Sequence, residues 1–371
     1  MIKQLLRFTK RLPLYALFGR WRTDCPFEPG YTIALPCPMD MPFLLSLALK
    51  GLTALNTPNC KQILVVPDGW GDDQGAGLRK VVDEFDDPRI QMVELRGIDY
   101  RVIRAMRPPG CARTHWMLVV NSVLNARHEY IFLHDADAFF LEADGLEKQY
   151  GEAKSRNMDV LGVTPRWDPF FKEHNLTIAG TWELLFSTRW ARKRSPMALY
   201  PGGWSTPHGD AAFDSMLYSQ YLDAARGTIG VMDKPPEFVH FNGTIYTYRT
   251  FRDRGAKTVT DELFRILLLS VIETAFGITG TERVTPELQV LERGLDDSAA
   301  PVSYRSEINQ RGYAEFRSMV SQMNRSPAFV GERAARINEQ LVRFDEHFEY
   351  DEHKTFRPAL EEGVLRQTGL G

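Results

Sequence analysis

The fold of this chain is decided by the stretch Tyr130-Ile131-Phe132-Leu133-His134-Asp135-Ala136-Asp137-Ala138-Phe139-Phe140. Its first four residues are apolar, as in a buried β-strand, and the chain then passes straight into two carboxylates two residues apart. Ligands of open α/β sheets bind at the carboxyl ends of the strands, so this position predicts a ligand site. In an extended chain, residues two apart point to the same side, so Asp135 and Asp137 would face one ligand.

Two carboxylates held close together repel each other, and a hard divalent cation such as Mn²⁺ or Mg²⁺ relieves that repulsion through oxygen coordination. A cation held in this way bridges a diphosphate and neutralises the charge that develops as the diphosphate leaves. The plainer alternative is a loop whose aspartates cap the following turn. An Asp-x-Asp tripeptide alone leaves both interpretations open.

The segments around this stretch alternate between short apolar runs and helical patterns, which is typical of βα units and a largely parallel sheet. Strands are predicted at residues 31–35, 62–66, 90–95, 130–133, 160–164, 181–187 and 238–241. Helices are predicted at residues 43–55, 78–85, 113–127 and 210–225. The apolar stretch 263–278 contains Arg265 and Glu273 and is predicted to be a buried helix rather than a membrane span. Beyond residue 281 the pattern is charged and helical.

The composition of the chain excludes several classes of protein. The 371 residues include 45 Lys and Arg against 48 Asp and Glu, and the net charge of −3 offers no overall basic field for nucleic acid. Hydrophobic residues make up 43% of the chain, which predicts a folded protein of about two to three domains at this length. The four cysteines form no Cys-x-x-Cys pair, so we expect reduced thiols in a cytoplasmic protein.

The first 22 residues differ from the rest in being basic and apolar, with no acidic residue before Asp24. The apolar run 12–19 is shorter than the roughly 20 residues that cross a bilayer. One interpretation is a peripheral segment that contacts an anionic membrane at its inner, cytoplasmic face. The other is a solvated arm packed on the domain, and it carries equal weight because Pro13 is expected to interrupt an amphipathic helix. The sequence favours neither.

Three further segments, taken with the Asp-x-Asp stretch, resemble the glycosyltransferases of the GT-A fold and in particular their family 2. They are Ile33-Ala34-Leu35-Pro36, Val65-Val66-Pro67-Asp68-Gly69-Trp70-Gly71-Asp72 and Ala126-Arg127-His128-Glu129-Tyr130-Ile131. The resemblance covers residues 31–250 and departs from family 2 at Val119-Val120, where that family commonly has an Arg-Asn pair. The sequence also lacks a later Gln-x-x-Arg-Trp element, which disfavours a processive enzyme resembling cellulose synthase.

The resemblance implies an α/β protein with a GT-A (Rossmann-like), mixed and mostly parallel sheet flanked by helices, followed by a C-terminal helical extension. The implied domains are a basic amphipathic N-terminal segment at 1–30, a catalytic domain at 31–255 and a mainly helical region at 256–371. The implied function is metal-dependent transfer of a sugar from a nucleotide-sugar donor to a hydroxyl of a glycan or a lipid-linked acceptor.

The resemblance also implies a set of metal ligands. Asp137 would bind the metal directly, while Asp135 would contact the ribose or reach the metal through water. We expect the third ligand to be His240, at the end of the late strand, because an imidazole suits Mn²⁺ better than Mg²⁺. A structural, hydrogen-bonded histidine is the alternative at this position.

The donor nucleotide is expected at the ends of the first two predicted strands. Pro36, in the first motif, would line the nucleotide pocket, and Asp68, in the second, would contact the base. Arg249 would hold the diphosphate through two parallel hydrogen bonds, although a solvated arginine fits the sequence equally well.

The acceptor is expected near the Pro- and Gly-rich segment 201–210. Gly209-Asp210, before a predicted helix, resembles the step at which inverting GT-A enzymes place their general base, a carboxylate that must reach the acceptor hydroxyl. Asp210 is the first choice for this base and Asp214, one helical turn later, is the second, while a plain helix cap is the alternative. Three side chains are expected to contact the sugar or the acceptor: Trp204, His208 and Trp167.

Two rival functions fit parts of the same pattern. A nucleotidyltransferase uses a similar sheet and paired carboxylates, but usually carries a Gly-rich, basic loop after the first strand. The segment Pro36-Cys37-Pro38-Met39-Asp40 has neither a glycine nor a basic residue. A non-catalytic domain of the same fold would instead bind a sugar, or a partner protein through its helical tail.

Overall fold

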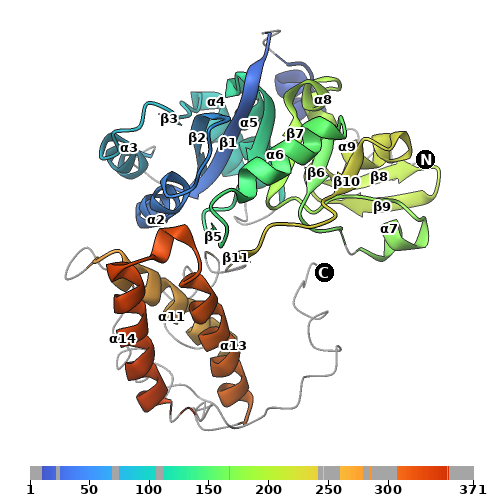
Figure 1. The fold of residues 1–371 in the computed structure, drawn as a ribbon. Coiled ribbons are helices and arrows are strands. Elements are labelled where there is room, and N and C mark those ends of the chain that lie inside the picture. The colour runs from blue at the N-terminus through green and yellow to red at the C-terminus, as the bar shows by residue number, and fades with distance from the viewer. Residues whose placement is uncertain are drawn as a thin grey trace. The chain divides into compact units, whose positions relative to one another are not determined.

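The computed structural model describes residues 11–21, 26–68, 75–105, 112–166, 168–240, 245, 260–278, 285, 307–348 and 350. The chain divides into two compact units, whose elements Figure 1 labels. The first comprises residues 1–240 with 325–328, and the second comprises residues 241–324 with 329–371. Within the described residues, no helix has the length and the apolar character needed to cross a membrane.

The first unit is built around a seven-stranded sheet with the order β10-β6-β7-β4-β1-β2-β3 (Figure 1). Its strands, in that order, are Ile229–Val231, Val160–Gly162, Leu184–Ser187, His128–Leu133, Glu28–Pro38, Cys60–Asp68 and Ile90–Met92. Strand β7 runs antiparallel to both neighbours, β4 and β6, while the other neighbouring pairs are parallel. This order confirms the predicted α/β class with a mixed, mostly parallel sheet. Six of the predicted strands lie in it, and β10 has no counterpart in the prediction.

Two smaller sheets, each of two strands, belong to the same unit. Strand β5 (Ala138–Phe140) pairs antiparallel with β11 (Phe238–His240), so the late predicted strand joins the segment directly after the Asp-x-Asp motif. Strand β8 (Gly202–Thr206) pairs antiparallel with β9 (Gly209–Phe213). The first of these pairs positions a candidate metal ligand.

Helices cover both faces of the large sheet. Successive residues of a strand point to opposite faces, so each strand contributes side chains to both layers of the core. Strand β4 contributes Ile131 to a core that includes Trp116 of α5 (Ala112–Asn125) and Trp190 of α8 (Thr188–Arg192). On the opposite face, Tyr130 packs against Tyr150 of α6 (Gly145–Ser155), with ring centroids 5.8 Å apart. The central strand β4, which ends in the Asp-x-Asp motif, is therefore held from both sides.

Further helices of this unit connect the strands. They are α2 (Pro42–Thr53), α3 (Ala76–Asp83), α4 (Gly97–Ala105), α7 (Pro169–Glu173) and α9 (Leu217–Asp223), with 3₁₀ turns at Pro196–Leu199 and Ala224–Arg226. Helices α2, α3 and α5 confirm the predictions at 43–55, 78–85 and 113–127.

The helix predicted at residues 210–225 is wrong over its first half. Residues 209–213 form strand β9, and α9 begins only at Leu217. The chain reverses at Gly209, whose φ of +107° is readily adopted only by glycine, and β9 then pairs with β8. Pairing with β8 satisfies the backbone groups of Asp210–Phe213, so it outweighs the weak helix preference of this segment.

The described part of the N-terminal segment is a helix over residues 11–18 packed on the first unit. Phe18 is buried, with its ring centroid 5.3 Å from that of Trp116, and Nε1 of Trp21 donates to the Arg194 carbonyl at 2.6 Å. Pro13 lies inside this helix, so the prediction that it interrupts the helix is wrong. Proline is tolerated in a first helical turn, where Pro13 lies in the described helix.

The second unit is helical in its described part. Helix α11 (Thr260–Ala275) packs against both α13 (Glu307–Met323) and α14 (Glu332–His347). Buried side chains of α11 include Leu268 and Ile272, and the rings of Phe316 and Phe344 join α13 to α14 with centroids 5.8 Å apart. The buried helix predicted at 263–278 is confirmed where it is described.

Candidate functional site

Asp135 and Asp137 lie in the turn between β4 and β5, at the carboxyl end of β4. The backbone N–H of His134 donates to the Ala34 carbonyl of β1 at 3.0 Å, which continues the pairing of β4 with β1 into this turn. The chain leads from β1 to β2 on one side, while β4 lies on the other side of β1. Such a switch point opens a crevice at the carboxyl ends of the strands, where ligands of α/β sheets bind.

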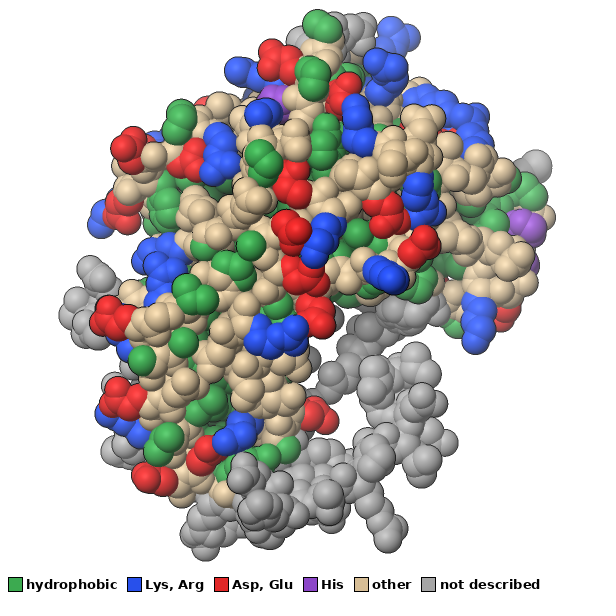
Figure 2. All heavy atoms as spheres, viewed as in Figure 1, with side chains coloured by type: hydrophobic (Ala, Val, Ile, Leu, Met, Phe, Trp, Pro, Cys, Tyr) green, Lys and Arg blue, Asp and Glu red, His purple; other side chains and the backbone are tan. Residues whose placement is uncertain are grey.

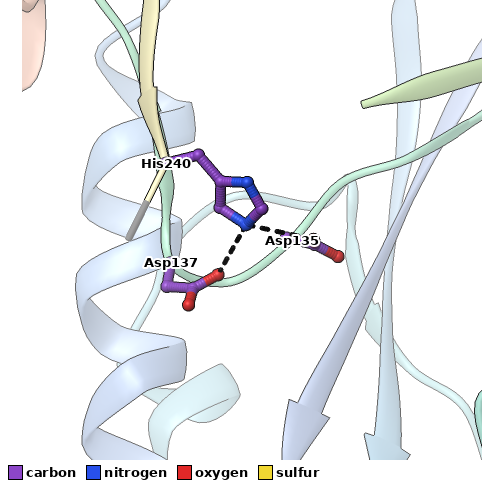
Figure 3. Close-up of side chains that lie close together, drawn as sticks. All are labelled: Asp135, Asp137 and His240. Atoms are coloured by element: carbon purple, nitrogen blue, oxygen red, sulfur yellow. Dashed lines mark ion pairs between the residues drawn. The ribbon is translucent and has the colours of Figure 1, made fainter. Parts of the chain in front are cut away.

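His240 reaches the two carboxylates because β11 pairs with β5 and sets His240 opposite Ala138. Its Nε2 lies 3.3 Å from Oδ2 of Asp135 and 3.4 Å from Oδ1 of Asp137, as Figure 3 shows. One ligand atom from each side chain lies within 4.8 Å of the others. The structure thus brings together the three residues predicted as metal ligands from segments about a hundred residues apart.

Burial and mutual charge shift the pKa of each member of this cluster. Burial opposes protonation of His240, but hydrogen bonds to Asp135 and Asp137 outweigh it and raise the His240 pKa to about 10. Burial also disfavours both carboxylates. It raises the pKa of Asp137, whereas the hydrogen bond from His240 overcomes it and lowers the pKa of Asp135. The cluster therefore holds a positive charge between two carboxylates, which is the place a divalent cation would take.

The donor atoms of the cluster fit such a cation. Two carboxylates and one imidazole suit Mn²⁺, whereas Mg²⁺ prefers oxygen ligands alone and keeps several waters. To act as a ligand His240 must be neutral, so the cation would replace the proton that the imidazole holds in its absence.

Glu183 supports the Asp-x-Asp turn from the start of β7. Its buried carboxylate pairs with Nδ1 of His134 at 2.8 Å and accepts the backbone N–H of Asp135 at 3.3 Å. Burial lowers the pKa of His134, but Glu183 overrides that effect and raises it. Glu183 itself has a φ of +48°, a strained conformation that tends to occur at functional sites. The sequence signal was an acid inside an otherwise apolar strand, and our sequence reasoning missed it.

Trp182 packs beside the cluster of Asp135, Asp137 and His240. It is half-buried, and its ring centroid lies 5.1 Å from that of His240 and 5.7 Å from that of Phe238. Sequence reasoning selected other tryptophans, because the position of Trp182 depends on the pairing of distant strands.

The predicted donor residues lie at the same edge of the sheet as Asp135. Strands β1, β2 and β4 are parallel, so their carboxyl ends share that edge. Pro36 and Asp68 stand at the ends of β1 and β2, both half-buried, with Pro38 opposite Asp68 in the register. Arg249 and Trp167 lie outside the described residues.

The predicted acceptor residues of the β8–β9 hairpin have other partners. Asp210 is exposed on β9 and accepts a hydrogen bond from Oγ of Ser205 at 2.8 Å, so it does not cap a helix. His208 is exposed at the turn and stacks on His174, with centroids 4.2 Å apart.

Trp204 of the same hairpin is held between two other side chains. It stacks on Tyr218 at 4.0 Å, and the Arg11 guanidinium lies 4.3 Å from its ring centroid. Two neighbours this close cannot share one face of a ring, so the expected sugar-stacking face is covered in this structure.

Asp214, the second choice for a base, begins a short chain of contacts that reaches His115 on α5. It lies half-buried just before α9 and accepts the backbone N–H of Ser215 at 2.7 Å. The Ser215 hydroxyl hydrogen-bonds Nδ1 of His115 on α5, and the charge of His115 helps to lower the pKa of Asp135. The next residue, Met216, is buried with a φ of +69°, a second strained backbone position. Sequence reasoning missed His115.

Comparisons with known proteins found similarity only to solved structures. No protein-family model and no curated protein matches the sequence. A mannosyltransferase of Pyrobaculum calidifontis, solved with GDP-Man and Mn²⁺, is 14% identical over 93% of this chain and 91% of its own, with a TM-score of 0.38. A glucosyl-3-phosphoglycerate synthase of Mycobacterium tuberculosis, solved with Mn²⁺ and uridine diphosphate, is 11% identical. The match covers 68% of this chain and 82% of the synthase, with a TM-score of 0.36. TarS of S. aureus is 13% identical over 90% of this chain and 97% of its own, with a TM-score of 0.35. At these values the similarity assigns neither an activity nor a substrate to this chain.

Proposed function

We propose that this protein is a metal-dependent glycosyltransferase that moves a sugar from a nucleotide-sugar donor to an acceptor hydroxyl. The observation that carries the proposal is the cluster of Asp135, Asp137 and His240 at the switch point of a mixed, mostly parallel sheet. When bound there, the divalent cation would supply positive charge to the diphosphate leaving group.

On the donor side, Pro36 and Asp68 would contact the nucleotide, because both lie at the sheet edge that carries Asp135. Arg249 would hold the diphosphate with two parallel hydrogen bonds. The half-buried Trp182, beside His240, would offer its ring to a sugar of the donor or the acceptor. The acceptor class we propose is a glycan or a lipid-linked sugar.

For the general base we propose Asp214 rather than Asp210. Asp214 is half-buried and linked through Ser215 to His115, which interacts electrostatically with Asp135, whereas Asp210 is exposed on a hairpin and hydrogen-bonded within it. Asp214 would take the proton of the acceptor hydroxyl as its oxygen bonds to the anomeric carbon and the bond to the diphosphate breaks. Direct displacement of this kind inverts the anomeric centre.

The test is turnover of nucleotide sugars by the full chain. We expect one or a few of the UDP-, GDP-, CMP- and dTDP-sugars to be hydrolysed or transferred in the presence of Mn²⁺, and chelation to abolish the reaction. Mass spectrometry of the released nucleotide measures it. Metal-independent cleavage, or release of pyrophosphate from a nucleoside triphosphate and a sugar phosphate, would overturn the proposal in favour of other chemistry.

A further inference from the structure

We propose that a surface of the first unit that carries several exposed cations and two exposed leucines docks on the anionic headgroups of a lipid bilayer. This surface, called here the basic face, comprises Leu12, Leu17, Arg20, Arg189, Lys193, Arg194 and Arg226. The inference does not depend on the proposed sugar transfer, because it rests on a different part of the molecule.

The helix at residues 11–18 has two different sides. Its inner side packs on the core through Leu14, Tyr15 and the buried Phe18. Its outer side exposes Leu12 and Leu17, which are 46% and 37% accessible. Leu12 and Leu17 are five residues apart, about 140° around the helix axis, so they flank its outward side as two separate exposed apolar groups.

Cations gather next to this helix. Trp21 Nε1 donates to the Arg194 carbonyl at 2.6 Å, which ties the end of the N-terminal segment to the residues that follow α8. Figure 2 shows Lys and Arg side chains gathered over the part of the surface where Figure 1 places α8. The N-terminal helix with its two exposed leucines and the cations near α8 therefore lie on neighbouring segments of one unit.

The charges on the basic face do not balance. Lys193, Arg194 and Arg226 converge on the single buried carboxylate of Asp223, at 3.6, 2.6 and 2.9 Å. Asp159 lines a pocket with Arg189 and Lys193 and is a second acid here, so these three cations and Arg189 face two carboxylates, which leaves an excess of two positive charges. Arg20 and Arg189 are also exposed, and the preceding sequence adds Lys3, Arg7 and Lys10 with no acid.

A bilayer with anionic lipids matches this combination. Leucines on a surface helix enter the boundary between headgroups and acyl chains, and neighbouring cations bind the phosphates, each contributing about 1 kcal/mol. Both earlier interpretations of the N-terminal segment then hold for residues 11–21: one side packs on the protein and the other faces the lipid. A glycosyltransferase seated this way would have ready access to a lipid-linked acceptor.

The experiment is co-sedimentation of the full chain with vesicles of phosphatidylcholine, with or without phosphatidylglycerol, in the absence of nucleotide and metal. We expect binding only to the anionic vesicles, and weakening as salt rises. The L12S/L17S variant should bind on the order of tenfold more weakly. The R20E/R189E variant should lose about fivefold for each arginine.

Matched controls come from the second unit. Val330 and Val342 are 60% and 56% accessible, so V330S/V342S removes exposed apolar groups that are not part of the basic face. R336E/R343E does the same for exposed arginines of α14. Both controls should bind as the wild type does, and L12S/L17S should keep its melting temperature and its nucleotide-sugar turnover. Absence of binding to anionic vesicles, equal binding to neutral ones, or equal losses in the controls would each overturn the proposal, whatever the turnover assay shows.

Discussion

At the scale of single residues, the site depends on how firmly the Asp-x-Asp turn is held before a ligand arrives. Asp135 and Asp137 meet His240 directly, but the turn itself is fixed by Glu183, which contacts both His134 and the backbone of Asp135. Groups of this kind orient ligands without touching the metal, and their loss typically weakens metal binding 10- to 100-fold.

Glu183 gives the first prediction. Glu183→Ala should weaken Mn²⁺ binding by about 10- to 100-fold, because the backbone N–H of Asp135 loses its buried acceptor and the turn loses its anchor. Glu183→Gln should restore most of the affinity, since its amide oxygen still accepts that hydrogen bond. Calorimetry with Mn²⁺ measures both variants. A lower melting temperature with unchanged Mn²⁺ affinity would mean that Glu183 only stabilises the fold.

Asp214 gives the second prediction. Asp214→Asn should lower kcat by about 10²- to 10⁴-fold while leaving donor affinity unchanged, because the amide cannot accept the acceptor proton. Asp210→Asn serves as the matched control and should keep nearly full activity. The product of the wild type should carry the inverted anomeric configuration by NMR. A reversed ranking of the two variants would move the base to the β8–β9 hairpin.

At the scale of elements, the sequence predicted best what depends on neighbours along the chain. Strand β4 and the motif after it were recognisable from apolar residues that run directly into two carboxylates. His240 could also be selected from the sequence as a candidate ligand, since it lies at the end of a short apolar strand. Trp182 and Glu183 were not, because they reach the site only when β7 pairs antiparallel beside β4. The acid within an apolar strand marks Glu183 as unusual, but its place at the site depends on this long-range pairing, and a similar dependence explains why residues 209–213 form a strand instead of a helix.

The junction between α8 and α9 gives a prediction at the element scale. Asp223 accepts hydrogen bonds from Arg194 and from Nε1 of Trp190, and these contacts lower its pKa to about 2. A carboxyl with a depressed folded-state pKa stabilises the fold above its unfolded pKa of about 3.9 and loses that contribution as the pH falls toward 2. The contribution at neutral pH is on the order of 2 kcal/mol.

Asp223→Asn should therefore lower the free energy of unfolding by about 2 kcal/mol at pH 7, and by much less near pH 2. Urea unfolding followed by tryptophan fluorescence at several pH values measures the difference. Asp233→Asn is a suitable control, because its exposed side chain, 89% accessible, lies 4.0 Å from its nearest cation. A destabilisation that stays the same at both pH values would show that packing, not charge, accounts for the role of Asp223.

At the scale of the whole molecule, the net charge of −3 hides a strongly uneven distribution. The metal cluster brings one buried and one half-buried carboxylate together at one sheet edge, and the basic face brings cations together around α8 and Asp223. The composition correctly indicated a folded chain of average character, but it could not locate either feature. Both depend on which surface the fold turns outward. The helical second unit, in contrast, follows from the charged, periodic sequence beyond α11.

The most direct test of the central claim is calorimetric titration of nucleoside diphosphates into the full chain, with and without Mn²⁺, for the wild type and for Asp137→Ala. The wild type should bind one of UDP, GDP, CDP or dTDP only with Mn²⁺. Asp137→Ala should abolish this binding while its melting temperature stays close to that of the wild type. Binding that is unchanged by the substitution, or that does not require a divalent cation, would contradict the assignment of Asp135, Asp137 and His240 as a metal site.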